Sequence, residues 1–328
     1  MSQLQSEMGE TSALLRAFNW DAVAQVGESL KKSGRLFISG EGSSRILPGH
    51  QAQDAAWRWN SKLVVRTQGS YQSMDYNLSE DTILLGSNSG FTKETTTLLR
   101  KLLAEGHRDI WGVTSNPESP LAKESPHTYV LKAGTEKAVA ASKSIAEQTL
   151  FTIASIAAAE GRDLRANALR AADAFDEIFA QEIDPEFINR LAAARILFFA
   201  GVNDGVAEEL TLKTNEICSK PSAFFEGTYC YHGPEEVMTS RDVIVFVNPF
   251  ESEDANTAKI FQREVGCTVL CISSRPTSFP TIRIPSVPDF DWLLSLAAGW
   301  RLLIATGNAL GNDVDHPRRA RKVGNPIV

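Results

Sequence analysis

The chain has 328 residues, of which 43% are hydrophobic and 22% charged, an ordinary globular balance that excludes disorder for the bulk of the chain. Domains usually take about 100–200 residues, so this length predicts two of them. The net charge of −7 disfavours nucleic-acid binding, which usually needs a basic surface. No apolar run reaches the roughly 20 residues that span a bilayer, so we expect neither nucleic acid nor a membrane as a partner.

The start of the chain and its cysteines indicate where the protein is located. The first ten residues, MSQLQSEMGE, are polar and acidic, whereas a secretory signal has a basic start followed by an apolar segment. The four cysteines are irregularly spaced, which indicates reduced thiols rather than a disulfide framework. Both features predict a cytoplasmic protein.

Three strand-like runs of the first half recur in the same order in the second half. The matched runs are RLFISG (35–40) with RILFFAG (195–201), DTILLGSN (81–88) with DVIVFVNP (242–249), and DIWGVTSN (109–116) with TVLCISSR (268–275). The members of each pair lie 159–161 residues apart. One such pair can arise by chance, but three in register indicate a duplicated fold.

Within each copy, short apolar runs alternate with helical patterns. Buried strands that alternate with helices predict an α/β fold, a parallel sheet with helices on both faces in a three-layer, flavodoxin-like αβα arrangement. We expect a helical lead over 1–30, a first domain over 31–165, a linker helix over 166–190 and a second domain over 191–328. Ligands of such sheets bind at the carboxyl ends of the strands, so the loops that follow the strands are the candidate sites.

The loop after the first predicted strand reads SGEGSSR at positions 39–45. It lacks the third glycine of a dinucleotide-binding fingerprint, because Arg45 stands there. Its backbone N–H groups and the hydroxyls of Ser43 and Ser44 can bind an anion, or the segment can be a plain turn into a helix.

The loop after the next predicted strand, GSNSGFT at 86–92, is more informative. It places Ser87, Asn88, Ser89 and Thr92 before a helical pattern, where unpaired N–H groups and the helix dipole attract an anion. A phosphate monoester fits this loop, and the missing GxxxxGK[ST] pattern excludes a Walker loop. The alternative is a helix-capping loop without a ligand. The second copy has Pro249 and Glu251 here, which remove a donor and repel an anion, so we expect phosphate in the first copy only.

A lysine lies within the apolar stripe of a predicted helix at 206–220. Lys213 is flanked by Glu209 four residues before it and Glu216 three residues after it. A surface pair of Glu209 with Lys213 would contribute only about 0.2–0.5 kcal/mol. A buried lysine would need a charged partner, which favours a functional role.

Two further segments hold candidate residues. His232, in the turn YHGPEE, is either functional or a plain surface histidine. No zinc site is expected around it, because neither CxxC nor HExxH is present. The tail DVDHPRRARK (313–322) is typical of a solvated basic tail, with Lys322 as the alternative functional group.

Four of these segments together resemble the sugar isomerase (SIS) family in its tandem form. They are GSNSGFT, AGTEKAVAASK (133–143), LTLKTNE (210–216) followed by HGP (232–234), and the terminal DVDHPRRARK. The resemblance extends to the isomerase half of glucosamine-6-phosphate synthase, to glucosamine-6-phosphate deaminases and to fructosamine-6-phosphate deglycases. It implies two tandem SIS-type domains and no metal or other cofactor.

The resemblance also implies roles for individual residues. The substrate's phosphate and sugar would be bound by Ser43, Ser44, Ser87, Asn88, Ser89, Thr92 and the backbone of Val139. Glu216 would move a proton between C1 and C2 with help from Lys213, and Lys322 would contact the open sugar or form an imine with it. His232 would open the sugar ring from a neighbouring subunit, which implies a homodimer.

No glutaminase domain precedes residue 1, so we expect no glutaminase activity and favour the degradative direction. The predicted function is aldose–ketose isomerisation of an aminated hexose 6-phosphate with release of ammonia. One alternative is a deglycase of fructosamine 6-phosphates, because Glu236 follows His232 as in the HGPxE pattern of those enzymes. Another is a non-catalytic phosphosugar sensor.

Overall fold

The computed structural model describes residues 1–327 and divides into two compact units. The N-terminal unit comprises Glu10–Leu169 and the segment from Ala320 onward, and the C-terminal unit comprises Met1–Gly9 and Arg170–Arg319. These bounds differ from the sequence-based ones at both chain ends. The first helix joins the C-terminal unit because Asp315 accepts hydrogen bonds from the backbone N–H groups of Gln3 and Leu4.

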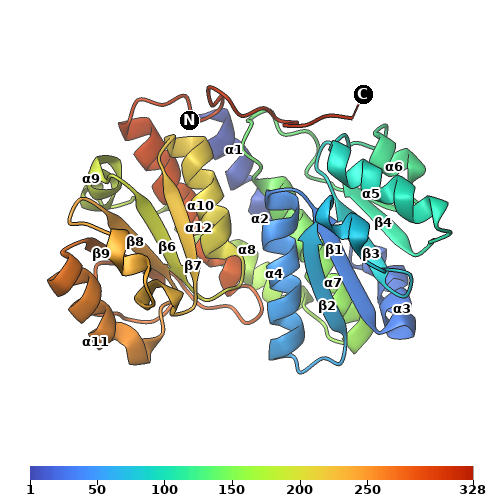
Figure 1. The fold of residues 1–328 in the computed structure, drawn as a ribbon, viewed down its shortest axis with the longest axis horizontal. Helices are drawn as coiled ribbons and strands as arrows, with labels where there is room; N and C mark the ends of the chain where they lie inside the picture. The colour runs from blue at the N-terminus through green and yellow to red at the C-terminus, as the bar shows by residue number, and fades with distance from the viewer. Residues whose placement is uncertain (328) are drawn as a thin grey trace. The chain divides into compact units, whose positions relative to one another are not determined.

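The N-terminal unit is built on five parallel strands in the order β2-β1-β3-β4-β5 (Figure 1). The strands are β1 (Arg35–Gly40), β2 (Val64–Gly69), β3 (Thr82–Gly86), β4 (Ile110–Thr114) and β5 (His127–Val130). The central strands are buried on both faces, which is why they are near-continuous apolar runs. The edge strand β2 is half-buried and correspondingly more polar.

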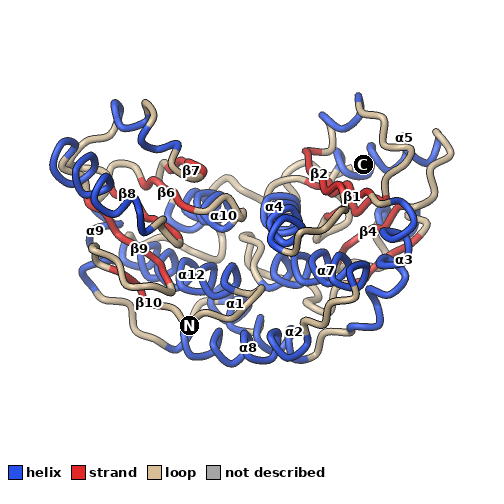
Figure 2. The backbone as a smooth tube through the Cα atoms, turned by 90° about the horizontal axis from the view of Figure 1, so that it is seen from below, coloured by secondary structure: helices blue, strands red, loops and turns tan. Residues whose placement is uncertain are grey.

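Helices cover both faces of this sheet, as Figure 2 shows around the strands labelled β1, β2 and β4. They are α2 (Thr11–Arg16), α3 (Ala24–Ser33), α4 (Ser43–Arg58), α5 (Lys93–Ala104), α6 (Pro120–Glu124) and α7 (Lys143–Glu160). Helix α7 packs against α3 and α4 on one face, and α5 and α6 pack together on the other. The core under α5 and α6 includes Phe37, Leu85 and Leu98.

The C-terminal unit repeats this plan, with parallel strands in the order β10-β9-β8-β6-β7. Its strands are β6 (Leu197–Gly201), β7 (Ser222–Glu226), β8 (Val243–Val247), β9 (Thr268–Ser273) and β10 (Thr281–Arg283). Its helices are α1 (Gln3–Gly9), α9 (Pro185–Ala193), α10 (Val206–Lys213), α11 (Asp254–Thr257) and α12 (Asp291–Ala309), with a π-helical segment at Ala258–Val265. Helix α8 (Arg165–Ala180) continues the chain from one unit into the other.

The predicted single linker helix is two helices. Helix α8 ends at Ala180, and α9 begins again at Pro185. The side chain of Asp184 caps α9 by accepting a hydrogen bond of 2.8 Å from the N–H of Glu186, and proline fits the first helical position because its missing N–H is not needed there. Nowhere in residues 1–327 is a helix both long and apolar enough to cross a membrane.

The two units confirm the duplicated, three-layer αβα fold. In each unit the first and third strands begin with the same ion pair: Arg35 with Asp81 at 3.7 Å, and Arg195 with Asp242 at 2.7 Å. Asp242 is almost completely buried, and although burial raises its pKa, the guanidinium of Arg195 and hydrogen bonds from Thr239 hold that pKa below its ordinary value. The pairs lie at the amino ends of the strands, so the carboxyl ends are left for ligands.

Candidate active site

The GSNSGFT loop links β3 to α5 at the carboxyl edge of the N-terminal sheet. Ser87 is buried, and its hydroxyl lies 2.8 Å from the hydroxyl of Thr92 and accepts a hydrogen bond of 3.1 Å from the N–H of Gly90. Gly90 has a φ of +71°, and a Cβ there would lie 2.0 Å from the Ser119 hydroxyl oxygen, so only glycine fits. The loop is therefore held in a compact turn with its hydroxyls facing one another.

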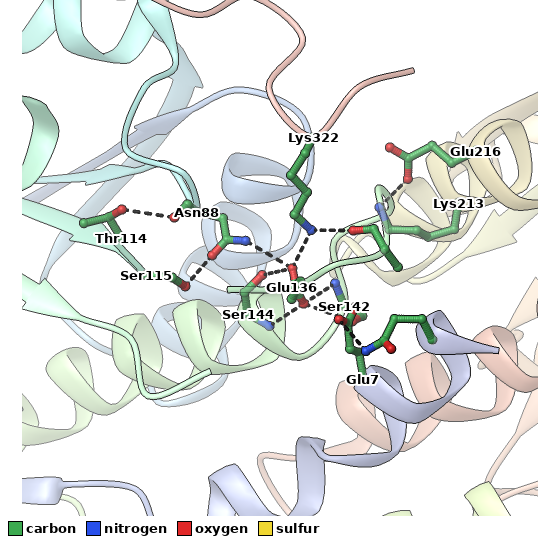
Figure 3. A network of polar contacts seen from close by, with 12 residues as sticks. Glu7, Asn88, Thr114, Ser115, Glu136, Ser142, Ser144, Lys213, Glu216 and Lys322 are labelled. Atoms are coloured by element: carbon green, nitrogen blue, oxygen red, sulfur yellow. Dashed lines mark hydrogen bonds and ion pairs between the residues drawn. The ribbon is translucent and has the colours of Figure 1, made fainter. Parts of the chain in front are cut away.

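Asn88 ties this loop to two neighbouring strand ends. Its backbone carbonyl accepts hydrogen bonds from the Thr114 hydroxyl at 3.1 Å and from the Ser115 N–H at 3.0 Å, both at the end of β4. Its side-chain oxygen accepts a hydrogen bond from the Ser115 hydroxyl, and its amide nitrogen donates to Glu136 at 3.1 Å. Figure 3 shows these contacts converging on Asn88.

Glu136 is the centre of a buried polar network in the loop between β5 and α7. Its side chain is fully buried, and one oxygen accepts hydrogen bonds from the N–H and hydroxyl of Ser142 at 2.9 Å each. The other oxygen accepts from the Ser144 hydroxyl at 2.8 Å and from Lys322 at 2.9 Å (Figure 3). Burial alone would raise the pKa of this carboxyl, but the Lys322 ammonium and the hydrogen bonds from Ser144 outweigh burial and hold it below its ordinary value.

Lys322 reaches this network from the end of the chain. Besides Glu136, its ammonium donates to the backbone carbonyl of Ala138 at 2.9 Å. Further along the tail, the carbonyl of Asn325 accepts from the N–H of Lys93 at 2.9 Å, and the N–H of Ile327 donates to the carbonyl of Phe91 at 2.8 Å. These contacts explain why the tail from Ala320 belongs to the N-terminal unit. Val139 is half-buried in the same loop as Ala138.

The first predicted loop lies at the same edge of the sheet. Ser43 and Ser44 open α4, directly after Gly42, whose φ is +54°. A Cβ on Gly86, the residue before Ser87, would lie 2.7 Å from the Ser44 carbonyl oxygen. The start of α4 therefore touches the start of the GSNSGFT loop, and the N-terminal unit brings together Ser43, Ser44, Ser87, Asn88, Ser89, Thr92, Val139 and Lys322 at one edge of its sheet.

The C-terminal unit holds a completely buried lysine. Lys213 ends α10, and the helix continues as a π-helical turn over Thr214–Cys218. Its ammonium lies 3.2 Å from Glu209. It also lies 2.6 Å from Glu216, and Figure 3 shows this second pair. The side chain of Glu209 is also fully buried, whereas that of Glu216 keeps 20% of its surface exposed. Of the two carboxylates, only Glu216 can therefore meet a ligand.

Electrostatics keep Lys213 charged despite its burial. Desolvation would lower its pKa, but the carboxylates of Glu209 and Glu216 outweigh this effect and raise the pKa above its ordinary value. A buried ammonium with two carboxylates leaves the trio one negative charge in excess when all three groups are ionised. Such a trio can pass a proton to and from a ligand at Glu216.

His232 lies on an exposed turn of the C-terminal unit, after the short helical turn Tyr229–Tyr231. It lines an open hollow of about 570 Å³ together with Asn203, Glu226, Gly227, Thr228 and Tyr229. The turn assignment made from the HGP sequence is thus confirmed.

Two residues of the site were not recognised as functional from the sequence. Glu209 was considered as half of a surface pair, and its complete burial became visible only in the fold. Glu136 was passed over because a single carboxyl between small residues is a weak signal. Its position as the one acidic residue of AGTEKAVAASK is the feature that could have singled it out.

The comparisons with known proteins begin with a match inside the N-terminal unit. A family model described as the SIS domain matches residues 29–158. Over 317 residues it is 27% identical to a glutamine–fructose-6-phosphate aminotransferase (isomerizing) from Bacillus spizizenii. The alignment covers 90% of this chain and 52% of that protein, so the chain spans about half the length of the curated relatives it matches.

Solved structures extend the likeness to the second unit. The C-terminal domain of glucosamine-fructose-6-phosphate aminotransferase from Francisella tularensis has a TM-score of 0.80 and covers 97% of this chain and 98% of its own, at 17% identity. Glucosamine-6-phosphate deaminase from Thermotoga maritima has a TM-score of 0.75 and covers 98% and 99%, at 18% identity. The chain thus has the same two-domain fold as these proteins over nearly its whole length.

Proposed function

We propose that this protein is a phosphosugar isomerase of the SIS family that acts on an aminated hexose 6-phosphate and releases ammonia. In the open sugar, a proton moves from C2 to C1, the amine nitrogen gives up one proton and the C1 oxygen gains one, which converts the 2-amino aldose into the 2-imine of the ketose. Water then replaces the nitrogen at C2, giving a ketose phosphate and ammonia. The relatives named above include a glutamine–fructose-6-phosphate aminotransferase and a glucosamine-6-phosphate deaminase, which supports this substrate class.

The phosphate would bind in the N-terminal unit. The hydroxyls of Ser87 and Thr92, the side chain of Ser89 and the N–H groups of Glu94 and Thr95 in the first turn of α5 offer donors to a dianion. Held there by its phosphate, the sugar is oriented for reaction. Ser43, Ser44 and the backbone of Val139 would contact the same ligand, and Lys322 the open sugar.

The observation that carries the proposal is the pair of Lys213 and Glu216. A fully buried ammonium 2.6 Å from a carboxylate with 20% exposure is an arrangement for proton transfer rather than for a surface ion pair. Glu216 is the group that would take the proton from C2 and return it to C1, and Lys213 would stabilise its charge. Positioned proton transfer of this kind contributes about 10²–10⁴-fold to a rate.

The function is tested with a panel of substrates, with ammonia, amino-acid and ketose phosphate release all monitored. We expect turnover of glucosamine 6-phosphate with ammonia release, and interconversion of glucose 6-phosphate and fructose 6-phosphate at most slowly. Release of an amino acid from fructosyl-amino-acid 6-phosphates would instead identify a deglycase. Tight binding of a sugar phosphate without turnover of any panel member would identify a sensor.

We further propose that His232 opens the sugar ring in a site of a neighbouring subunit, within a homodimer. Its exposure on a turn supports this role, because the side chain is free to meet another chain. Dimers that combine one His232→Ala chain with one Glu216→Gln chain should then regain activity at one of their two sites. Two inactive homodimers that stay inactive after mixing and co-expression would contradict a shared site.

The deglycase remains the second candidate because of the surroundings of His232. A sugar–amino-acid adduct needs room beyond the nitrogen, and the hollow of about 570 Å³ beside His232 offers it. Glu236, exposed on the same turn, would then face the amine end of the adduct. Glu236→Gln should lower turnover of such adducts far more than turnover of glucosamine 6-phosphate.

A further inference from the structure

Gln148, on the first turns of α7, is a buried amide without a partner. Its side chain is 2% exposed, and neither Nε2 nor Oε1 has a hydrogen-bond partner among residues 1–327. Its neighbour Glu147, equally buried, accepts three hydrogen bonds from Tyr129, Lys132 and Ala133. Leaving a buried amide unpaired is costly, so such groups are rare in native proteins.

The position of this amide relates it to the GSNSGFT loop. A Cβ on Gly86 would lie 2.9 Å from Gln148 Oε1 and 2.7 Å from the carbonyl oxygen of Ser44. Gly86 immediately precedes Ser87, the first hydroxyl of the loop. The amide of Gln148 therefore faces the point where the start of α4 meets the start of the loop.

The carbonyl of Ser44 lacks its usual helical donor. In an α-helix this carbonyl would accept from the N–H of the fourth residue on, which is Pro48, and proline has no N–H. The unpaired amide of Gln148 and a carbonyl without its usual i+4 donor thus lie beside the same glycine, Gly86. Rotation of the terminal amide by half a turn exchanges Nε2 and Oε1, so either atom can point toward the carbonyl.

We propose that Gln148 is a positioning residue of the sugar-phosphate site. When a sugar phosphate occupies the GSNSGFT loop, Nε2 of Gln148 donates to the carbonyl of Ser44 and fixes the Ser43–Ser44 turn against Gly86. Without the ligand, the unpaired amide of Gln148 destabilises the protein. Ligand binding removes this destabilisation by giving the amide a hydrogen-bond partner. The inference rests on the proposed function only in that a sugar phosphate is the ligand.

Two substitutions test this mechanism from opposite sides. Gln148→Met keeps the length of the side chain and removes its polar atoms. Pro48→Ala supplies an N–H to the carbonyl of Ser44 and so competes with Gln148 for it. Both should raise the melting temperature of the ligand-free protein by about 2–4 °C, and both should weaken binding of fructose 6-phosphate about fivefold to tenfold, the worth of one hydrogen bond. Thr149→Val is the matched control, because its buried hydroxyl bonds its own helix at Ile145 and should leave affinity unchanged.

Calorimetry of fructose 6-phosphate binding and thermal unfolding give separate readouts. If Gln148 had only a structural role, replacing it would lower the melting temperature and leave the affinity for fructose 6-phosphate unchanged. Either of these two results for Gln148→Met overturns the proposal. Weaker binding by Gln148→Met with unchanged affinity in Pro48→Ala also overturns it, because Ser44 is then not the acceptor. If Pro48→Ala does not fold, Gln148→Met decides alone. Failure of the unmodified protein to bind any sugar phosphate would instead contradict the proposed function.

Discussion

The loops that follow the third strand of each sheet differ although the sheets themselves match. After β3, the loop is a compact turn of hydroxyls and glycines whose donors face one another. After β8, Arg275 fills the corresponding region: it donates to the carbonyl of Pro249 at 3.0 Å and pairs with Asp254 at 2.8 Å. Glu251 adds a further negative charge at that edge.

The helices that follow the first strand of each sheet also differ, and here the C-terminal unit is the one that carries the candidate functional charges. Helix α10 holds the buried Lys213 between two carboxylates, whereas α4 opens with Ser43 and Ser44 and contains Pro48. The two units thus share their strand order and their Arg–Asp pairs, and they carry different polar residues at the carboxyl edges of the sheets. Under the proposed function, one copy binds the anion and the other moves the proton.

The largest expected effect follows from removing the proton carrier of the C-terminal unit. Glu216→Gln should lower kcat for glucosamine 6-phosphate about 10²–10⁴-fold, because the amide cannot accept the C2 proton, while affinity for fructose 6-phosphate changes little. Steady-state kinetics and calorimetry measure the two quantities. Glu208→Gln, one position from Glu209 on the same helix, is the control. Near-normal turnover by Glu216→Gln would refute the assignment of the acid–base group.

Removing the charge of Lys213 should cost stability as well as activity. Lys213→Met leaves Glu209 buried without its counter-charge, and breaking a buried pair in this way costs about 3–5 kcal/mol. Urea unfolding monitors the loss. Lys259→Met, at a lysine whose side chain is 62% exposed, should change stability by less than about 1 kcal/mol. Equal losses in the two variants would mean that the burial of Lys213 has no energetic consequence.

The difference between the two loops predicts an asymmetric effect on ligand affinity. Ser87→Ala and Thr92→Val each remove one donor to the phosphate and should weaken fructose 6-phosphate binding about tenfold, with kcat reduced less. Glu251→Gln, in the matching loop of the C-terminal unit, should leave affinity unchanged. Equal weakening by the Ser87 and Glu251 variants would show that both loops, or neither, bind the anion.

The smallest effect concerns acid stability. The pKa of Glu136 lies below its ordinary value of 4.5, so its ionised form stabilises the fold above about pH 4.5, and this stabilisation is lost as the pH falls through the lower folded pKa. Glu136→Gln should therefore lose less stability than the unmodified protein between pH 6 and pH 4. Urea unfolding at several pH values gives both slopes. The exposed Glu28→Gln serves as the control, and parallel slopes for all three proteins would contradict the effect.

The strands, the duplication and the αβα layers followed from the sequence, because they depend on short-range patterns. A buried parallel strand needs a continuous apolar run whatever surrounds it, and the run DTILLG or DVIVFV can be read without knowing its neighbours. The hydroxyl-rich loop and the turn at His232 were likewise found from local composition, since glycine and proline fix chain reversals by themselves.

Only the tertiary structure decided which polar groups meet. Lys322 bonds Glu136 across 186 residues of sequence, and this contact moves the tail into the N-terminal unit. The complete burial of Glu209 and the unpaired amide of Gln148 have no local signature either. The energies of charges and hydrogen bonds depend on burial and on the partners that the fold brings together. Neither the burial of a group nor its partners can be predicted from the residues adjacent to it in the sequence.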